Sequence, residues 1–197
     1  MNTLFTTMLR GGGCLGGFVT PGLNLSVNDV QTVYFAYVRR LSPHFSLELA
    51  GGIPPKTTMV GKGPATIGSV PYAGQNLATS RWFSPTALLN YNFFDESAQI
   101  RPYVGVGVNF TRFSDNTLTA AGQAAFGGPT SATLSDSTGW AATTGVSYRL
   151  QDRWNLHASY SLSQIKSNLS ANTSGAIRST SIDFKPSAIV LSVGYSF

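Results

Sequence analysis

Residues 101–113 read Arg-Pro-Tyr-Val-Gly-Val-Gly-Val-Asn-Phe-Thr-Arg-Phe, and this stretch decides the fold. Its even-numbered positions carry large apolar side chains, from Pro102 to Phe110. Its odd-numbered positions carry smaller or more polar ones, from Tyr103 to Thr111. Successive residues on a β-strand point to opposite faces, so a period of two indicates a strand with one apolar face.

The same alternation recurs along the chain. In residues 154–163, Leu156 and Leu162 alternate with His157 and Ser159. The predicted strands are 2–10, 31–41, 45–50, 86–94, 101–113, 139–150, 154–163 and 189–197. An even number of strands places both chain ends on the same side of a barrel.

The connections between these strands alternate between short and long. Short turns fall at 41–43, 95–99 and 151–153, and long connections at about 11–28, 55–81, 114–137 and 166–182. Outer-membrane barrels have short periplasmic turns and long extracellular loops. The sequence therefore predicts an all-β fold. It is an eight-stranded antiparallel transmembrane β-barrel that occupies residues 1–197 as one domain in the bacterial outer membrane.

Composition excludes several other classes of protein. Charged residues make up 11% of the 197-residue chain, and the net charge of +5 is scattered rather than clustered, which argues against nucleic-acid binding. The single cysteine, Cys14, excludes a disulfide scaffold. The longest uncharged runs are rich in Gly, Pro, Ser, Thr and Asn, unlike a membrane-spanning helix. The sequence from Met1 shows no signal peptide.

The low charge also predicts which face of the strands meets lipid. If the apolar face pointed inward, small uncharged residues would cover the outside, which is a poor soluble surface. We therefore expect the apolar face to contact lipid and the small polar residues to fill a narrow lumen. Aromatic residues at strand ends predict two interfacial girdles, although core packing is an alternative for each. The predicted interface aromatics are Phe93, Phe110, Trp140, Tyr148, Trp154, Tyr195 and Phe197, with Trp82, Phe83 and Phe113 as further candidates.

Several motifs occur in a fixed order along the chain. They are Gly52-Ile-Pro-Pro-Lys56, Ser84-Pro-Thr86, residues 101–113, Gly145-Val-Ser-Tyr148, Asp152-Arg-Trp154 and Gly194-Tyr-Ser-Phe197. From about residue 29 to the end, this series resembles the OmpW family of eight-stranded outer-membrane proteins. Phe184-Lys-Pro-Ser187 departs from the family's Leu-Asp-Pro-Trp, and the first strand is shorter than the family's. The terminal Phe197 resembles the signal that barrel-assembly machinery recognises.

No arrangement of residues predicts catalysis. His157 and Ser159 share one strand face but are spaced about 7 Å apart, too far for a direct hydrogen bond, and no acid lies on that face. Two distant histidines and one cysteine make no metal site. We expect a protein that is not an enzyme and needs no cofactor.

The resemblance implies passive entry of small, mainly hydrophobic molecules through the outer membrane, with sideways release into the bilayer. An eight-stranded lumen is about wide enough for side chains and too narrow for a porin-like channel. Small inward residues (Gly105, Gly107, Ala141 and Gly145) would leave space for a solute. The predicted substrate-path residues are Leu88, Tyr103, Asn109, Thr111, Thr143 and Ser161, with simple packing of the lumen as the alternative for each.

A different class of function remains open, namely a structural or adhesion barrel. Its loops would bind lipopolysaccharide, phage or a host surface. The basic residues expected near the outer strand ends are Lys56, Lys62, Arg81, Arg112 and Arg178, and they could pair with lipid A phosphates. An inward salt-bridged plug of Glu48, Arg149 and Lys185 would also argue against transport.

Overall fold

The computed structural model describes residues 2–5, 9–10, 24–151 and 153–196. The first strands are β1 (Asn2–Phe5), β2 (Leu9–Arg10), β3 (Asn24–Val27), β4 (Tyr34–Arg40), β5 (Phe45–Gly52), β6 (Lys56–Lys62), β7 (Thr66–Ile67), β8 (Val70–Pro71), β9 (Asn76–Phe83) and β10 (Thr86–Asn92). The later elements are β11 (Ile100–Leu118), α1 (Ala120–Phe126), β12 (Thr130–Leu134), β13 (Ser137–Gln151), β14 (Trp154–Ser163), β15 (Ile165–Thr173), β16 (Ala176–Phe184) and β17 (Ser187–Ser196).

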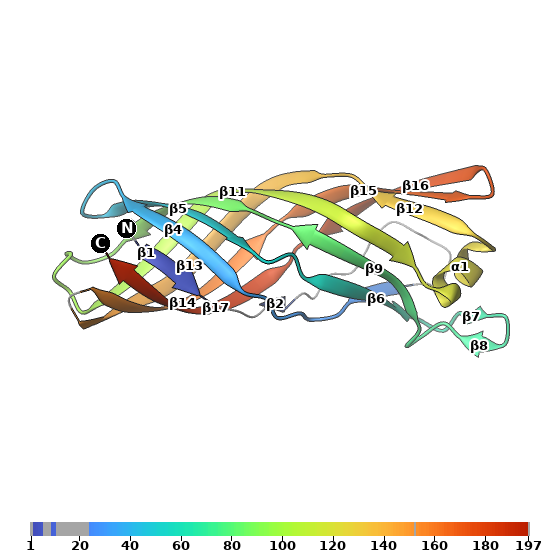
Figure 1. Cartoon of the computed structure of the whole chain (residues 1–197), viewed down its shortest axis with the longest axis horizontal. Coiled ribbons are helices and arrows are strands. Elements are labelled where there is room, and N and C mark those ends of the chain that lie inside the picture. The colour runs from blue at the N-terminus through green and yellow to red at the C-terminus, as the bar shows by residue number, and fades with distance from the viewer. Residues whose placement is uncertain (1, 6–8, 11–23, 152, 197) are drawn as a thin grey trace.

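Eight of these strands form a closed antiparallel ring (Figure 1). Its order is β10-β5-β4-β1-β17-β14-β13-β11, and the pairing of β11 with β10 closes it. The short strand β1 pairs with β4 on one side and with β17 on the other. Closure gives every strand of the ring a hydrogen-bonded neighbour on both sides, which limits the unpaired edges that hydrocarbon does not tolerate. The predicted eight-stranded barrel is confirmed.

The alternation seen in the sequence separates the two faces of the wall. On β11, Val106 is 67% exposed on the outside, whereas its neighbour Gly105 is buried. Inward residues such as Asn90 and Thr143 are also buried. The wall is thus apolar outside and small or polar inside, as we expected.

At three places, prolines separate a strand of the ring from the consecutive strand of the chain that lies beyond it. Pro54 and Pro55 separate β5 from β6, Pro85 separates β9 from β10, and Pro186 separates β16 from β17. Proline has no backbone N–H and cannot donate to a sheet ladder. Carbonyls at the breaks still accept hydrogen bonds, from Phe110 to Pro85 and from Ser163 to Pro186.

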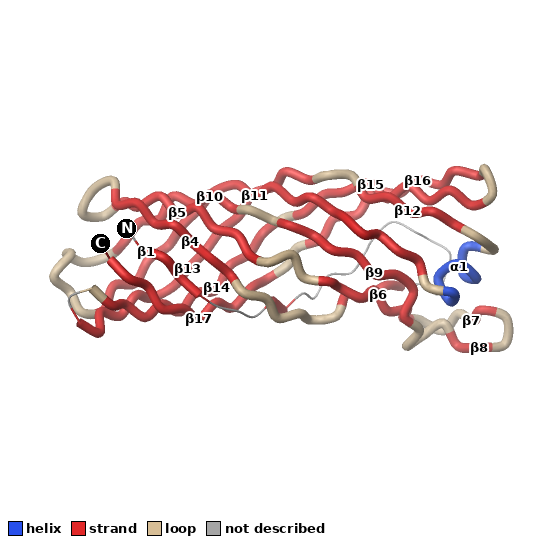
Figure 2. The backbone as a smooth tube through the Cα atoms, viewed as in Figure 1, coloured by secondary structure: helices blue, strands red, loops and turns tan. Residues whose placement is uncertain are grey.

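Beyond the breaks the chain forms an extension that the sequence analysis did not predict (Figure 2). The C-terminal part of β11, from Arg112 onward, pairs with β9. In turn β9 pairs with β6, and β6 pairs with β3. A second sheet has the order β12-β15-β16. The long connections therefore carry strands of their own. At the opposite end lie both chain termini and the turns β4–β5, β10–β11 and β13–β14, and we call this the turn end.

Among the described residues, no helix has the length and apolar character needed to cross a bilayer. Two predictions lie wholly or mostly outside the described residues, namely the terminal Phe197 and the long connection at about residues 11–28.

Candidate functional site

Three cavities follow one another along the inside of the described barrel. A polar cavity of about 500 Å³ lies toward the turn end, a middle cavity of about 100 Å³ lies at the proline breaks, and an upper cavity of about 50 Å³ lies in the extension. Tyr34, Ser161 and Val190 line both the polar and the middle cavity. Trp82 lines both the middle and the upper cavity.

The upper cavity is walled mainly by apolar side chains. Met59, Trp82 and Phe113 come from the β11-β9-β6 sheet, and Ile165 and Phe184 come from strands β15 and β16. The two sheets of the extension thus enclose an apolar space between them. Such a space favours an uncharged apolar solute over water.

The middle cavity takes residues from both faces of the wall. Leu88 and Ser161 point inward, whereas Leu162 is 38% exposed on the outer face, yet all three line this cavity. Pro55 and Pro186, from two of the strand breaks, also line it. The cavity therefore lies where the wall is interrupted.

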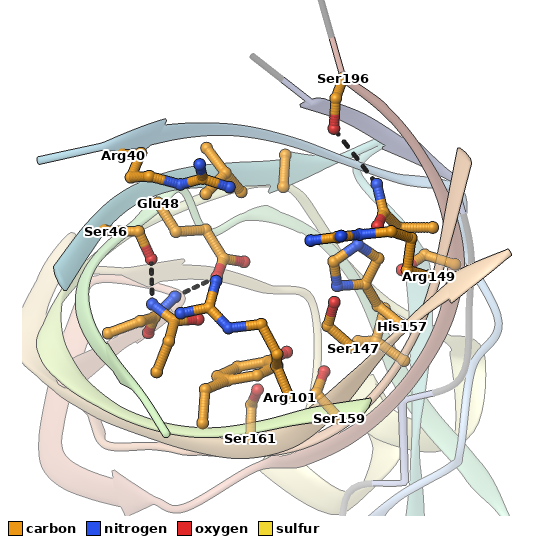
Figure 3. Close-up of a pocket in the computed structure, with 18 of the residues that line it drawn as sticks. Arg40, Ser46, Glu48, Arg101, Ser147, Arg149, His157, Ser159, Ser161 and Ser196 are labelled. Atoms are coloured by element: carbon orange, nitrogen blue, oxygen red, sulfur yellow. Dashed lines mark hydrogen bonds between the residues drawn. The ribbon is translucent and has the colours of Figure 1, made fainter. Parts of the chain in front are cut away.

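The polar cavity contains most of the charge inside the ring (Figure 3). Glu48 accepts a hydrogen bond of 2.7 Å from Asn90, and Arg40 forms an ion pair of 2.6 Å with Glu96. Arg101 donates to the carbonyls of Pro43 (2.7 Å) and Phe94 (3.2 Å) and so ties two turns together.

The expected salt-bridged plug of Glu48, Arg149 and Lys185 is not assembled. Arg149 lines the polar cavity with Glu48 but donates to the carbonyl of Glu96. Lys185 lies exposed between β16 and β17 and does not line this cavity. Among the described residues, no ion pair joins Glu48 to Arg149.

The predicted substrate-path residues fall into two groups. Leu88 and Ser161 line the middle cavity, and Tyr103 and Ser161 line the polar one. Thr143 is buried, lines none of the three cavities and accepts a hydrogen bond of 2.9 Å from Ser161. Asn109 and Thr111 are 1% and 0% exposed and line none of the three cavities.

Asn109 and Thr111 instead hold the strand break before Pro85. The side-chain amide of Asn109 donates to Ser84 Oγ at 2.9 Å, and the hydroxyls of Ser84 and Thr111 lie 2.7 Å apart. These contacts join β11 to the segment between β9 and β10. Their geometry indicates support of the wall.

Small inward residues do not leave open space at every position, contrary to expectation. A Cβ atom at Gly145 would lie 2.7 Å from Tyr103 Cζ, and one at Gly105 would lie 2.9 Å from Thr143 Cγ2 and overlap Asn90. Neighbouring side chains therefore fill these positions. Ala141, by contrast, lines the middle cavity, as expected of a small inward residue that leaves space for a solute.

Most of the predicted interface aromatics that the structure describes face outward, and Phe110 does so from the interior of β11 rather than from a strand end. Phe93, Phe110, Trp140, Tyr148 and Trp154 are exposed, and Trp154 packs edge-on against Tyr195 with ring centroids 5.1 Å apart. Trp82 and Phe113 are the exceptions, because Trp82 lines the middle and upper cavities and Phe113 lines the upper one. Trp82 is two residues from Ser80 and two from Ser84, which both point inward. This spacing in the sequence indicates that Trp82 also points inward.

Among the described residues, no group of three or more His, Cys, Asp and Glu side chains is placed to hold a metal ion.

The family model described as the OmpW family matches residues 22–197. The chain belongs to the OmpW family. Outer membrane protein W of Salmonella typhimurium is 31% identical over 186 residues, which cover 94% of this chain and 80% of that protein. Outer membrane protein W of Vibrio cholerae is 31% identical over 122 residues, which cover 62% of this chain and only 55% of that protein.

This OmpW-family chain is also similar to a solved barrel structure and to a protein named after a metabolic operon. The crystal structure of OprG from Pseudomonas aeruginosa superposes with a TM-score of 0.81 at 22% identity, covering 100% of this chain and 95% of that one. The dibenzothiophene metabolism operon protein PahQ of Pseudomonas aeruginosa is 29% identical over 106 residues, which cover 52% of this chain and 44% of that protein. This chain is an outer-membrane β-barrel. Its short turns gather at the turn end, and outer-membrane barrels have their short turns on the periplasmic side.

Proposed function

We propose that this OmpW-family barrel lets small, mainly hydrophobic molecules cross the outer membrane passively. A solute would enter the extension, pass Trp82 and leave sideways into the bilayer at the middle cavity. The observation that best supports a sideways exit is the lining of the middle cavity. Ser161 and Leu162 line it from opposite faces of the wall.

The proline breaks support a sideways exit. Strand ladders resist separation because each residue contributes backbone hydrogen bonds. Pro55 and Pro186 lack the donor, so fewer such bonds hold the wall at this level. A solute held beside Leu88 and Leu162 has an apolar surface leading outward.

The polar cavity argues against passage straight through the lumen. An apolar solute moving past Tyr34 would meet Glu48, Arg101 and Arg149. Displacing water from charged groups without replacing its hydrogen bonds is costly. The sideways route avoids this cost.

One relative points to a chemical class of solute. The name of PahQ places that protein in an operon for the metabolism of dibenzothiophene, an apolar aromatic compound. The apolar lining of the upper cavity, including Trp82 and Phe113, suits a solute of this class.

The experiment compares outer-membrane vesicles with and without the folded protein. Uptake of naphthalene and of glucose is measured side by side. The proposal predicts faster entry of naphthalene alone. Equal acceleration of both solutes would indicate a water-filled pore, and no acceleration of either would contradict transport.

A structural or adhesion barrel is the second candidate, and a cluster of outward basic residues favours it. Lys56 and Arg81 are direct cross-strand partners, and Arg112 lies diagonally from Arg81 on the neighbouring strand. All three are exposed, and Arg81 lies 3.4 Å from Asp115. Like charges placed opposite each other repel, so a bound phosphate would stabilise this arrangement.

This candidate predicts that the double variant K56Q/R81Q binds lipopolysaccharide about ten-fold more weakly. Exposed Lys166 on β15 supplies the matched control K166Q. Unchanged binding by the double variant would remove the support for this candidate. Naphthalene uptake by the same vesicles shows whether lipid binding and transport are separate.

A further inference from the structure

A row of polar side chains crosses four neighbouring strands of the polar cavity. Arg101 on β11 pairs with Ser147 on β13, Ser147 pairs with His157 on β14, and His157 pairs with Ser192 on β17. All four side chains line the cavity. We call Arg101, Ser147, His157 and Ser192 the polar row.

Arg149 lies beside this row. It is two residues from Ser147 on the same face of β13, and is therefore the diagonal cross-strand neighbour of Arg101. Diagonal neighbours are separated by about 7–8 Å, a span that long side chains bridge. Figure 3 shows Arg101, Arg149, Ser147 and His157 around the same cavity.

The charges around the cavity are only partly balanced by ion pairs. Arg40 is paired with Glu96, and Glu48, the carboxylate that lines the cavity, accepts its hydrogen bond from Asn90. Within the described ranges, the hydrogen-bond acceptors of Arg101 and Arg149 are backbone carbonyls. Two guanidinium groups therefore face one cavity, and among the described residues neither forms an ion pair with a carboxylate.

Two buried nitrogen atoms in the row also lack hydrogen-bond partners among the described residues. Arg101 is only 9% exposed, and its Nε is buried with no hydrogen-bond partner among the described residues. The buried Nε2 atom of His157 is likewise unpartnered there. Buried donors and charges that lack partners are costly, so such a site is stabilised by a ligand that accepts their hydrogen bonds.

We propose that the polar row and Arg149 form a binding site for a small oxyanion, a carboxylate or a phosphate. A guanidinium fork matches the paired oxygens of either group, and serine hydroxyls add further donors. The cavity of about 500 Å³ has room for a small organic acid or inorganic phosphate. Ionisable groups within a membrane protein mark functional sites, and here they mark one with net positive charge.

The site is independent of the proposed transport route. An apolar solute that leaves at the middle cavity passes neither Arg101 nor Arg149. Binding of an anion can therefore be present whether or not naphthalene uptake is observed. The test below measures binding alone, so its failure is distinct from a failure of transport.

The test titrates the folded full chain in lipid nanodiscs and follows the arginine Nε–Hε signals by nuclear magnetic resonance. The probes are sodium acetate and sodium phosphate, with sodium chloride at matched ionic strength. We expect saturable shifts of the Arg101 and Arg149 signals with at least one oxyanion. In R149Q and in S147A we expect affinity to fall about ten-fold.

The matched control is R39Q, which removes the same charge from the outer face of β4 next to Arg40. Its affinity should equal that of the unmodified protein. R101Q would also weaken the barrel, because Arg101 joins the β4–β5 and β10–β11 turns.

Each result decides the proposal. Saturation with acetate alone identifies a carboxylate site, with phosphate alone a phosphate site, and with both a general oxyanion site. Shifts no larger than those in sodium chloride would overturn the proposal. So would binding that R149Q and S147A leave unchanged.

Discussion

Ser161 and Leu162 are neighbours on β14 that point to opposite faces of the barrel wall, yet both line the middle cavity. In a continuous strand ladder the backbone separates two such side chains completely. Here Pro186 separates the consecutive strands β16 and β17 beside β14, and its carbonyl accepts the N–H of Ser163. The wall at this level therefore holds an apolar space that reaches both faces.

Replacing Asn109 by alanine should destabilise the barrel without changing transport. N109A removes the hydrogen bond to Ser84 and leaves the buried hydroxyls of Ser84 and Thr111 with one partner fewer. A cost of about 1–3 kcal/mol is expected in unfolding by urea, followed by gel mobility. Exposed Thr138 provides the control T138A. If N109A unfolded at the same urea concentration as the unmodified protein but no longer took up naphthalene, Asn109 would instead lie on the solute path.

Replacing Gly107 by alanine should also destabilise the folded barrel. A Cβ atom there would overlap the carbonyl oxygen of Ala87 and lie 2.8 Å from Leu88 Cα. Backbone cannot move aside as a side chain does, so a cost of about 1–3 kcal/mol is expected. At Gly51 the nearest atom would be Phe83 Cε2 at 3.6 Å, so G51A is the control. Equal urea midpoints for the two variants would contradict this account.

Shortening Trp82 should widen the route between the upper and middle cavities. Trp82 lines both, and W82A removes the side chain that they share. We expect faster uptake of bulky apolar solutes relative to small ones, measured as the ratio of phenanthrene to benzene entry. A barrier lowered by about 1 kcal/mol would raise that ratio roughly five-fold. F83W, on the outer face, should leave the ratio unchanged. An unaltered ratio in W82A would remove Trp82 from the route.

The sequence predicts the ring well because its strands obey a local rule. From Val104 to Phe110 each outward side chain is apolar and each inward one is small or polar, so the face of every residue follows from counting by two. The family followed from motifs such as residues 101–113. The extension was missed because strands such as β12 and β15 consist largely of Ser, Thr and Asn, which are common in loops.

The cavities could not be predicted because they depend on register and packing between distant strands. The two-residue spacing of Trp82 from Ser80 and Ser84 indicates that Trp82 points inward, but only the packing of the sheets shows that it lines both apolar cavities. The row from Arg101 to Ser192 likewise needs the register of four strands. Gly105 and Gly145 suggested open space, but side chains from other strands fill it.

The most direct test of the account compares L88W with S159F in the naphthalene uptake assay. Leu88 lines the middle cavity, whereas Ser159 lines the polar cavity below it and not the middle one. Filling the middle cavity should slow uptake about ten-fold, the rate equivalent of a steric cost of about 1.4 kcal/mol. Filling the polar cavity should leave uptake unchanged, because the solute has already left through the wall. Slow uptake in S159F with normal uptake in L88W would mean that the solute travels through the lumen, and would contradict the sideways exit.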